Sequence, residues 1–129
     1  MVKGRKTSFL VCSGLVALFA LSLMSCITQR DYTRPKDLQS LVSEKNQKYL
    51  LIDVRMPQEF SEGHIPTSVN IPVGDLQKVL SNEDRSLLVV VYCQSGRRSS
   101  LAKKTLDGMG FTSVVNFGAI SNWPGDLVK

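Results

Sequence analysis

The chain has 129 residues, which suffices for one folded domain and is too short for two independent cores. Its content of 43% hydrophobic and 21% charged residues is that of a globular protein and excludes disordered and fibrous classes. The net charge of +5 falls by three, to +2, when the cations of the first eight residues are set aside, and no basic run is interleaved with aromatic residues. We therefore expect no nucleic-acid partner.

The first 25 residues have the pattern of an export signal. Three cations without any acid precede an apolar run over residues 9–24, and these 16 residues are fewer than the roughly 20 that a membrane-spanning helix needs. The following stretch, Leu23-Met24-Ser25-Cys26, resembles the lipobox of bacterial lipoproteins. This resemblance implies that residues 1–25 are removed, that Cys26 carries a lipid, and that the lipid anchors the protein to a membrane of the bacterial cell envelope.

The chain beyond the signal divides into a tether, a domain and a short tail. Polar composition, a lack of periodicity and Pro35 predict the tether. The three segments cover residues 26–36, 37–125 and 126–129.

Within the domain, short apolar runs alternate with segments of helical periodicity. The runs predict strands over residues 49–54, 69–71, 87–92 and 114–117. Apolar residues at helical spacing predict helices from Asp37 onward and over residues 57–62, 75–80 and 101–109. This alternation predicts an α/β domain with a mostly parallel sheet, in which ligands bind at the carboxyl ends of the strands.

The cysteines point to Cys93 as the reactive group. Cys12 falls within the predicted signal and Cys26 at the predicted lipid site, so Cys93 is the thiol left free in the domain. It follows a buried strand and precedes a short turn into a helix, where backbone amides, a glycine and two arginines favour an anion. Such surroundings lower the pKa of a thiol and would also stabilise a persulfide. The residues predicted to bind the substrate or the persulfide are Gln94, Ser95, Gly96, Arg97, Arg98 and Ser99.

Three motifs, in order, resemble the rhodanese family. They are residues 51–55 with 59–60, 63–66 and 70–72, then residues 91–99, and finally residues 118–120 with Trp123. The resemblance implies a three-layer domain with a mostly parallel five-stranded sheet flanked by helices. It also implies a sulfurtransferase that carries sulfur as a Cys93 persulfide from a small donor such as thiosulfate to a thiol or cyanide acceptor, without a cofactor. The chain has Thr67-Ser68 where the family commonly has Gly-Ala, and Ala119 where a second glycine is common.

Asp53, Arg55 and His64 are predicted to support the site. Asp53 and Arg55 lie at the end of a strand, where they can form an ion pair that shapes the site. His64 invites a role as general base, but the resemblance implies a structural histidine that bonds to the local backbone. A metal would need more ligands than one histidine and one free cysteine provide, and Trp123 is expected to fill the core.

Three alternatives to sulfur transfer remain open. A cysteine phosphatase or arsenate reductase of the same fold would have a loop resembling Cys-x5-Arg, one residue longer than the Cys-x4-Arg that Cys93 and Arg98 form. A non-catalytic binding module of the envelope could use the same loop to hold an anion or a partner. Thiol redox exchange would need a resolving cysteine from another protein.

Overall fold

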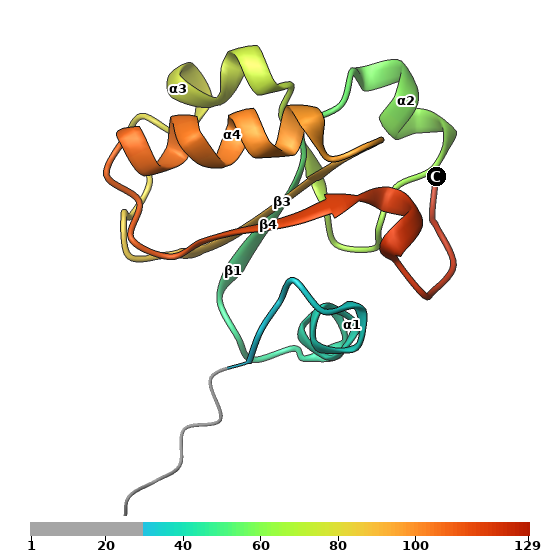
Figure 1. The fold of residues 1–129 in the computed structure, drawn as a ribbon. Coiled ribbons are helices and arrows are strands. Elements are labelled where there is room, and N and C mark those ends of the chain that lie inside the picture. The colour runs from blue at the N-terminus through green and yellow to red at the C-terminus, as the bar shows by residue number, and fades with distance from the viewer. Residues whose placement is uncertain (1–29) are drawn as a thin grey trace, which may run out of the picture.

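The computed structural model describes residues 30–129 (Figure 1). The predicted export signal and the predicted lipid site at Cys26 lie outside the described residues, and both stay predictions. Within residues 30–129, no helix combines the length and the apolar character that crossing a membrane requires.

Strands and helices alternate along the domain, as the sequence predicts. The strands are β1 (Tyr49–Asp53), β2 (Val69–Asn70), β3 (Leu88–Cys93) and β4 (Val114–Ala119); the helices are α1 (Pro35–Ser43), α2 (Pro57–Glu62), α3 (Leu76–Val79) and α4 (Arg97–Gly108), with 3-10 turns η1 (Val73–Asp75) and η2 (Ile120–Asn122). All strand pairs are parallel, in the order β2-β1-β3-β4. Figure 1 shows α3 and α4 on one face of this sheet and α1 on the other. The predicted α/β class, with a parallel sheet flanked by helices, is confirmed.

The expected fifth strand is wrong for the described residues, whose sheet has four strands. Residues 30–33 lie beside edge strand β4, where the two segments line one pocket. Tyr32 and Thr33 form a turn there and add no strand to the sheet. The Asp31 carboxylate accepts hydrogen bonds from the amide and hydroxyl of Thr33, and the Asp31 carbonyl accepts one from the Arg34 amide. Helix α1 follows at once, so this segment bends away instead of extending along β4.

Helix α1 begins at Pro35, two residues before the predicted start at Asp37. Proline suits the first helical position because its φ is already helical and its missing N–H has no partner there. Asp37 lies in the first turn and accepts a hydrogen bond from Arg34 Nε at 2.8 Å. Tyr32 belongs to the predicted tether, yet it is only 9% exposed and packs in the core. The packed domain therefore begins within the segment predicted to be a tether.

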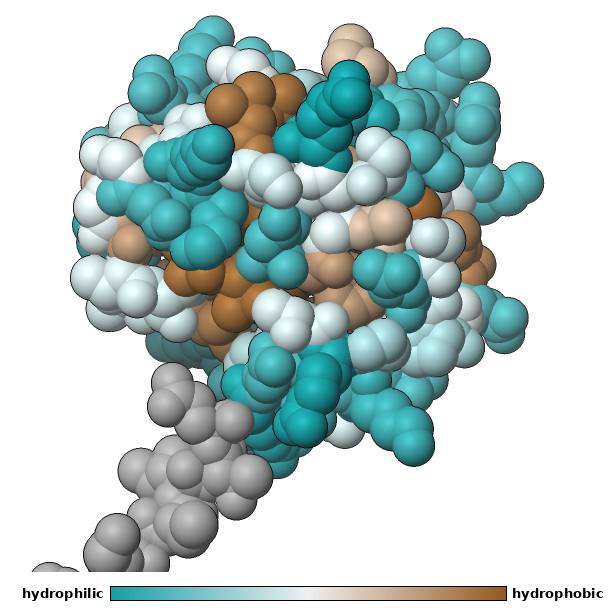
Figure 2. Space-filling model, in the orientation of Figure 1, coloured by the Kyte–Doolittle hydropathy of each residue, from teal (hydrophilic) through white to brown (hydrophobic). Residues whose placement is uncertain are grey.

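Apolar side chains fill the space on both faces of the sheet. The cluster beneath α3 and α4 includes Ile52, Val89, Val91, Ala102 and Leu106. The cluster beneath α1 includes Leu38, Leu41, Leu51, Val90 and Phe117. Because adjacent strand residues point to opposite faces, burial on both faces explains the continuous apolar runs of β1 and β3. Figure 2 shows a mostly hydrophilic exterior, with apolar patches across the middle of the molecule and a further one near the top, at the level of α3 and α4.

A bulge in β4 shifts the register of its last residues opposite the end of β3. Val91 pairs with Asn116 but Tyr92 pairs with Gly118, so Phe117 is the extra residue. The strand consequently continues past its predicted end at residue 117, and Ala119 pairs with Cys93.

Candidate active site

Cys93 ends β3, and the turn after it wraps backbone N–H groups around the sulfur. Sγ accepts hydrogen bonds from the amides of Gly96 at 3.0 Å and Ser99 at 3.4 Å, and Ser99 Oγ lies 3.6 Å away. Gly96 makes this turn with φ +93°, a value that side chains resist. Helix α4 starts at the next residue, Arg97, so the positive end of its dipole faces the sulfur.

The net effect of these surroundings is to lower the pKa of Cys93 below its ordinary value. Burial of the side chain opposes the charged thiolate and raises the pKa. Hydrogen bonds from the Ser99 amide and hydroxyl and from the Gly96 and Ser95 amides outweigh burial because they stabilise the negative charge. The loop therefore favours the thiolate, which is the nucleophilic form of cysteine.

A second set of contacts joins the reactive loop to α4 and β4. A Cβ added at Gly96 would lie 3.7 Å from Gly118 Cα, an ordinary van der Waals contact, so the loop packs against β4 and the φ of +93°, not lack of space, requires glycine there. Ser100 Oγ donates to the Gly96 carbonyl at 2.8 Å and accepts from Asn116 Nδ2 at 3.1 Å. The Asn116 side chain also accepts from the Gly118 amide. The bulge in β4 and the first turn of α4 thus hold the loop together.

Asp53 and Arg55 form the predicted ion pair, and both side chains are buried. Arg55 donates to both carboxylate oxygens of Asp53, at 2.7–3.0 Å. It also donates to the Gly63 carbonyl at 2.7 Å and to Gln94 Oε1 at 3.2 Å. Burial disfavours the charge of Arg55, but the hydrogen bonds and charge of Asp53 raise its pKa above the ordinary value. Arg55 therefore joins the end of β1, the segment after α2 and the reactive loop.

The two arginines of the loop lie in different surroundings. Arg97 is exposed and forms no ion pair within residues 30–129. Arg98 donates from Nη1 and Nη2 to the two carboxylate oxygens of Glu59, at 2.7 and 2.8 Å. These hydrogen bonds raise the pKa of Arg98, and the nearby charge of Cys93 adds to the effect. The sequence predicts that the Arg98 guanidinium binds a substrate anion, but in the structure both of its Nη groups bind Glu59.

His64 bonds to the local backbone. Its Nδ1 lies 3.1 Å from the Phe60 carbonyl, and its ring stacks on the Phe60 ring with centroids 3.7 Å apart. Its amide and carbonyl pair with Val128 near the end of the chain. This geometry fits a structural role better than general-base chemistry. Trp123 is half-buried beside the core, and its indole N–H donates to the Asp126 carbonyl.

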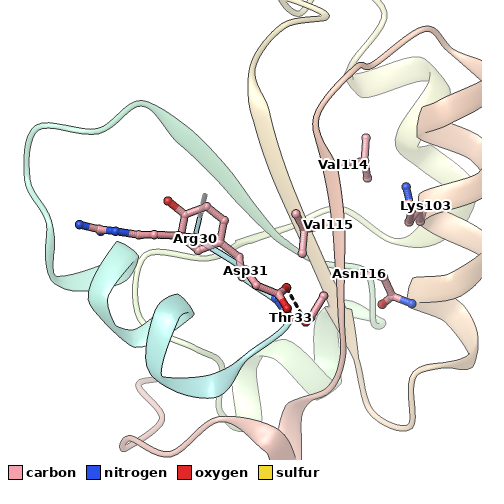
Figure 3. A pocket seen from close by; sticks show the side chains of 8 residues that line it. Arg30, Asp31, Thr33, Lys103, Val114, Val115 and Asn116 are labelled. Atoms are coloured by element: carbon pink, nitrogen blue, oxygen red, sulfur yellow. Dashed lines mark hydrogen bonds between the residues drawn. The ribbon is translucent and has the colours of Figure 1, made fainter. Parts of the chain in front are cut away.

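Within residues 30–129, the reactive loop holds no candidate metal site, and the pocket beside β4 lies elsewhere. Residues 30–129 contain no group of three or more His, Cys, Asp or Glu that could hold a metal. A pocket of about 460 Å³ lies between residues 30–33 and the β4 edge, with Lys103 at its rim (Figure 3). Two of its charged groups are engaged within the chain, because Arg30 pairs with Glu44 and Lys103 with Asp107. The Asp31 carboxylate, which also lines the pocket, accepts hydrogen bonds from Thr33.

Glu59 and Asn70 are parts of the site that sequence reasoning did not assign. Glu59 and Arg98 lie 39 positions apart, so no local pattern connects them. Asn70 Nδ2 donates to the carbonyls of Asp53 and Arg55, at 3.0 and 2.9 Å, and so fixes the end of β1. The one sequence feature that could have indicated this role is that Asn70 is a polar residue in an otherwise apolar strand.

The comparisons with known proteins agree with this geometry. The model of the rhodanese-like domain family matches residues 34–125. The chain is 41% identical over 94 residues to a putative mitochondrial thiosulfate sulfurtransferase of Schizosaccharomyces pombe, covering 62% of this chain and 66% of that protein. It is 36% identical over 73 residues to the thiosulfate sulfurtransferase PspE of Escherichia coli, covering 55% and 70%. A solved rhodanese with anions from E. coli superposes with a TM-score of 0.57 at 34% identity, covering 63% of this chain and 98% of that one.

Proposed function

Because the chain belongs to the rhodanese-like domain family, we propose that it carries sulfane sulfur as a persulfide on Cys93. The donor is a small compound such as thiosulfate, and the acceptor is a thiol or cyanide. Family membership and relatives named as sulfurtransferases support sulfurtransferase activity in the broad sense. The observation that carries the proposal is the Cys93 sulfur at the end of β3, which accepts hydrogen bonds from the Gly96 and Ser99 amides.

The proposed reaction has two nucleophilic steps. In the first, the Cys93 thiolate attacks the outer sulfur of thiosulfate, a bond forms between the two sulfur atoms, and sulfite leaves with the electron pair of the broken bond. In the second, a thiolate or cyanide attacks the outer sulfur of the persulfide, and the electron pair of the broken sulfur–sulfur bond returns to Cys93. Each step transfers one sulfur atom and needs no external oxidant or reductant.

The loop assists both steps by stabilising negative charge. The amides and the positive end of α4 face Sγ, which is charged before the first step and after the second. The persulfide moves this charge outward by one sulfur atom. Arg97, exposed beside the turn, supplies the free positive charge that attracts an anionic donor.

Phosphate chemistry fits the same loop less well. The spacing is Cys-x4-Arg, whereas the phosphatase loops of this fold resemble Cys-x5-Arg. In addition, both Nη groups of Arg98 already bind Glu59, so this arginine is not free to cradle a tetrahedral phosphate. Hydrolysis of an aryl phosphate that disappears in Cys93→Ser would contradict the sulfur-transfer proposal.

Mass spectrometry tests the persulfide directly. The protein is treated with thiosulfate and digested, and the peptide that contains Cys93 is weighed before and after addition of cyanide. We expect one added sulfur atom, which cyanide removes as thiocyanate, and no addition in the Cys93→Ser variant. An unmodified Cys93 in folded protein would overturn the proposal. Turnover in the thiosulfate:cyanide assay would then establish the reaction type.

We also propose that the protein is a lipoprotein of the bacterial cell envelope. The support is the resemblance of residues 23–26 to a lipobox after a basic and apolar leader. The anchor lipid would be attached at Cys26, which leaves the Cys93 thiol free for catalysis. Cells grown with a labelled fatty acid should incorporate the label into this protein but not into the Cys26→Ala variant. Equal labelling of both proteins, or of neither, would contradict the lipid anchor.

A further inference from the structure

The Glu59–Arg98 pair links two helices at the edge of the reactive loop. Glu59 lies in the first turn of α2, and Arg98 is the second residue of α4. Both side chains are about one third exposed, so the pair is accessible from solvent. The pair is bidentate, and Glu59 Oε2 also accepts the Met56 amide at 3.0 Å. Glu59 is therefore fixed at both ends of its carboxylate.

This pair changes the charge that the loop presents to an incoming anion. Without Glu59, two guanidinium groups would stand next to the turn that holds Cys93. With Glu59, the charge of Arg98 is balanced and its Nη groups are engaged, which leaves the backbone amides and Arg97 for the anion. Arg98 is the second residue of α4 and immediately precedes Ser99, whose amide donates to Cys93 Sγ, so it lies beside the reactive turn. A freed Arg98 would therefore act on anions at the same loop.

We propose that Glu59 is a specificity-determining residue that limits the affinity of the reactive loop for anions by holding Arg98. An anionic donor competes with Glu59 for the arginine fork, and a product such as sulfite is retained less tightly. This inference deepens the proposed function, and it rests on that function only for the identity of the anion. Glu59 holds Arg98 in the folded protein whichever anion binds at the loop.

Alkylation of Cys93 measures this restraint without sulfur transfer. Iodoacetate is an anion and iodoacetamide is neutral, so the ratio of their rates at the Cys93 peptide reports the attraction of the loop for anions. Glu59→Gln should raise this ratio about threefold, the size expected when one partly exposed charge loses its partner. Glu62→Gln is the matched control, since Glu62 is an exposed glutamate of the same helix that forms no ion pair with any residue from 30 to 129, and its ratio should stay at the wild-type value.

One further variant separates release of Arg98 from simple loss of charge, and a double variant tests whether the gain depends on Arg98. Glu59→Asp keeps the charge but is one methylene too short for the bidentate pair, so its ratio should lie between those of the wild type and Glu59→Gln. It also keeps the test available if Glu59→Gln does not fold. In Glu59→Gln/Arg98→Gln the gain should vanish.

An unchanged ratio in Glu59→Gln, or a gain that survives the removal of Arg98, would overturn the inference. A failure of Cys93 to take sulfur from thiosulfate would instead contradict the proposed function and leave the alkylation test intact.

Discussion

Replacing Ser99 by alanine should make Cys93 less reactive without moving it. The Ser99 hydroxyl lies 3.6 Å from Sγ and is one of the donors that lower the pKa of the thiol. The Ser99 amide, at 3.4 Å, stays in the variant. A hydrogen bond to a charged group is worth about 1.5–3 kcal/mol, and the long contact to sulfur reduces this one to about 1 kcal/mol. Such a loss lowers the thiolate fraction about fivefold at a pH below the pKa of the thiol.

The assay is the rate of iodoacetamide alkylation at the Cys93 peptide as a function of pH. Ser99→Ala should react about fivefold more slowly at low pH and reach a similar plateau at high pH, because only the pKa rises. Ser100→Ala is the matched control, since the Ser100 hydroxyl contacts the Gly96 carbonyl and Asn116 but not Sγ. An unshifted Ser99→Ala profile, or equal shifts in both variants, would refute the reasoning.

The remaining predictions concern stability. Asp53→Asn leaves the buried Arg55 without its anion and should lower the free energy of unfolding in urea by about 3–5 kcal/mol; an unchanged midpoint would contradict this. Thr67→Gly should raise that free energy by about 0.5–1 kcal/mol because Thr67 has φ +69°; a lower free energy would show that its hydrogen bond with the Tyr49 hydroxyl outweighs the strain. Arg98 lowers the pKa of Glu59 to about 2, so the pair stabilises the fold fully above the ordinary value of 4.5 and loses this effect as pH falls toward 2. Melting curves of Glu59→Gln should lack this part of the acid dependence, and a profile identical to that of the wild type would speak against it.

The predictable parts of the fold are those that a local pattern encodes. The apolar runs that became β1 and β3 mark strands buried on both faces, and this pattern also placed Asp53 and Cys93 at neighbouring strand ends. The turn after Cys93 was recognisable because a glycine and the start of a helix are local features. Element ends were less predictable: α4 begins at Arg97, before the first residue of its apolar face.

Features that depend on long-range packing were not predictable. The role of Glu59 depends on how closely α2 approaches α4, and residues 39 positions apart carry no joint signal. The apolar runs predicted the four strands that the sheet has, whereas the fifth strand was implied only by the family resemblance and had no segment of its own in the sequence.

The departure at Thr67-Ser68 shows how a change in packing can leave the chemistry intact. Thr67 takes a backbone conformation that glycine adopts without strain, so its presence is unfavourable locally. Ser68 offers a compensation, because its hydroxyl donates to the Ile65 carbonyl at 2.7 Å and lies 2.9 Å from the Tyr92 hydroxyl. The Ile65 amide donates to the same tyrosine oxygen at 3.0 Å, so these groups satisfy one another in a buried place. Tyr92 immediately precedes Cys93, and the network therefore fixes the strand end from which the reactive sulfur projects.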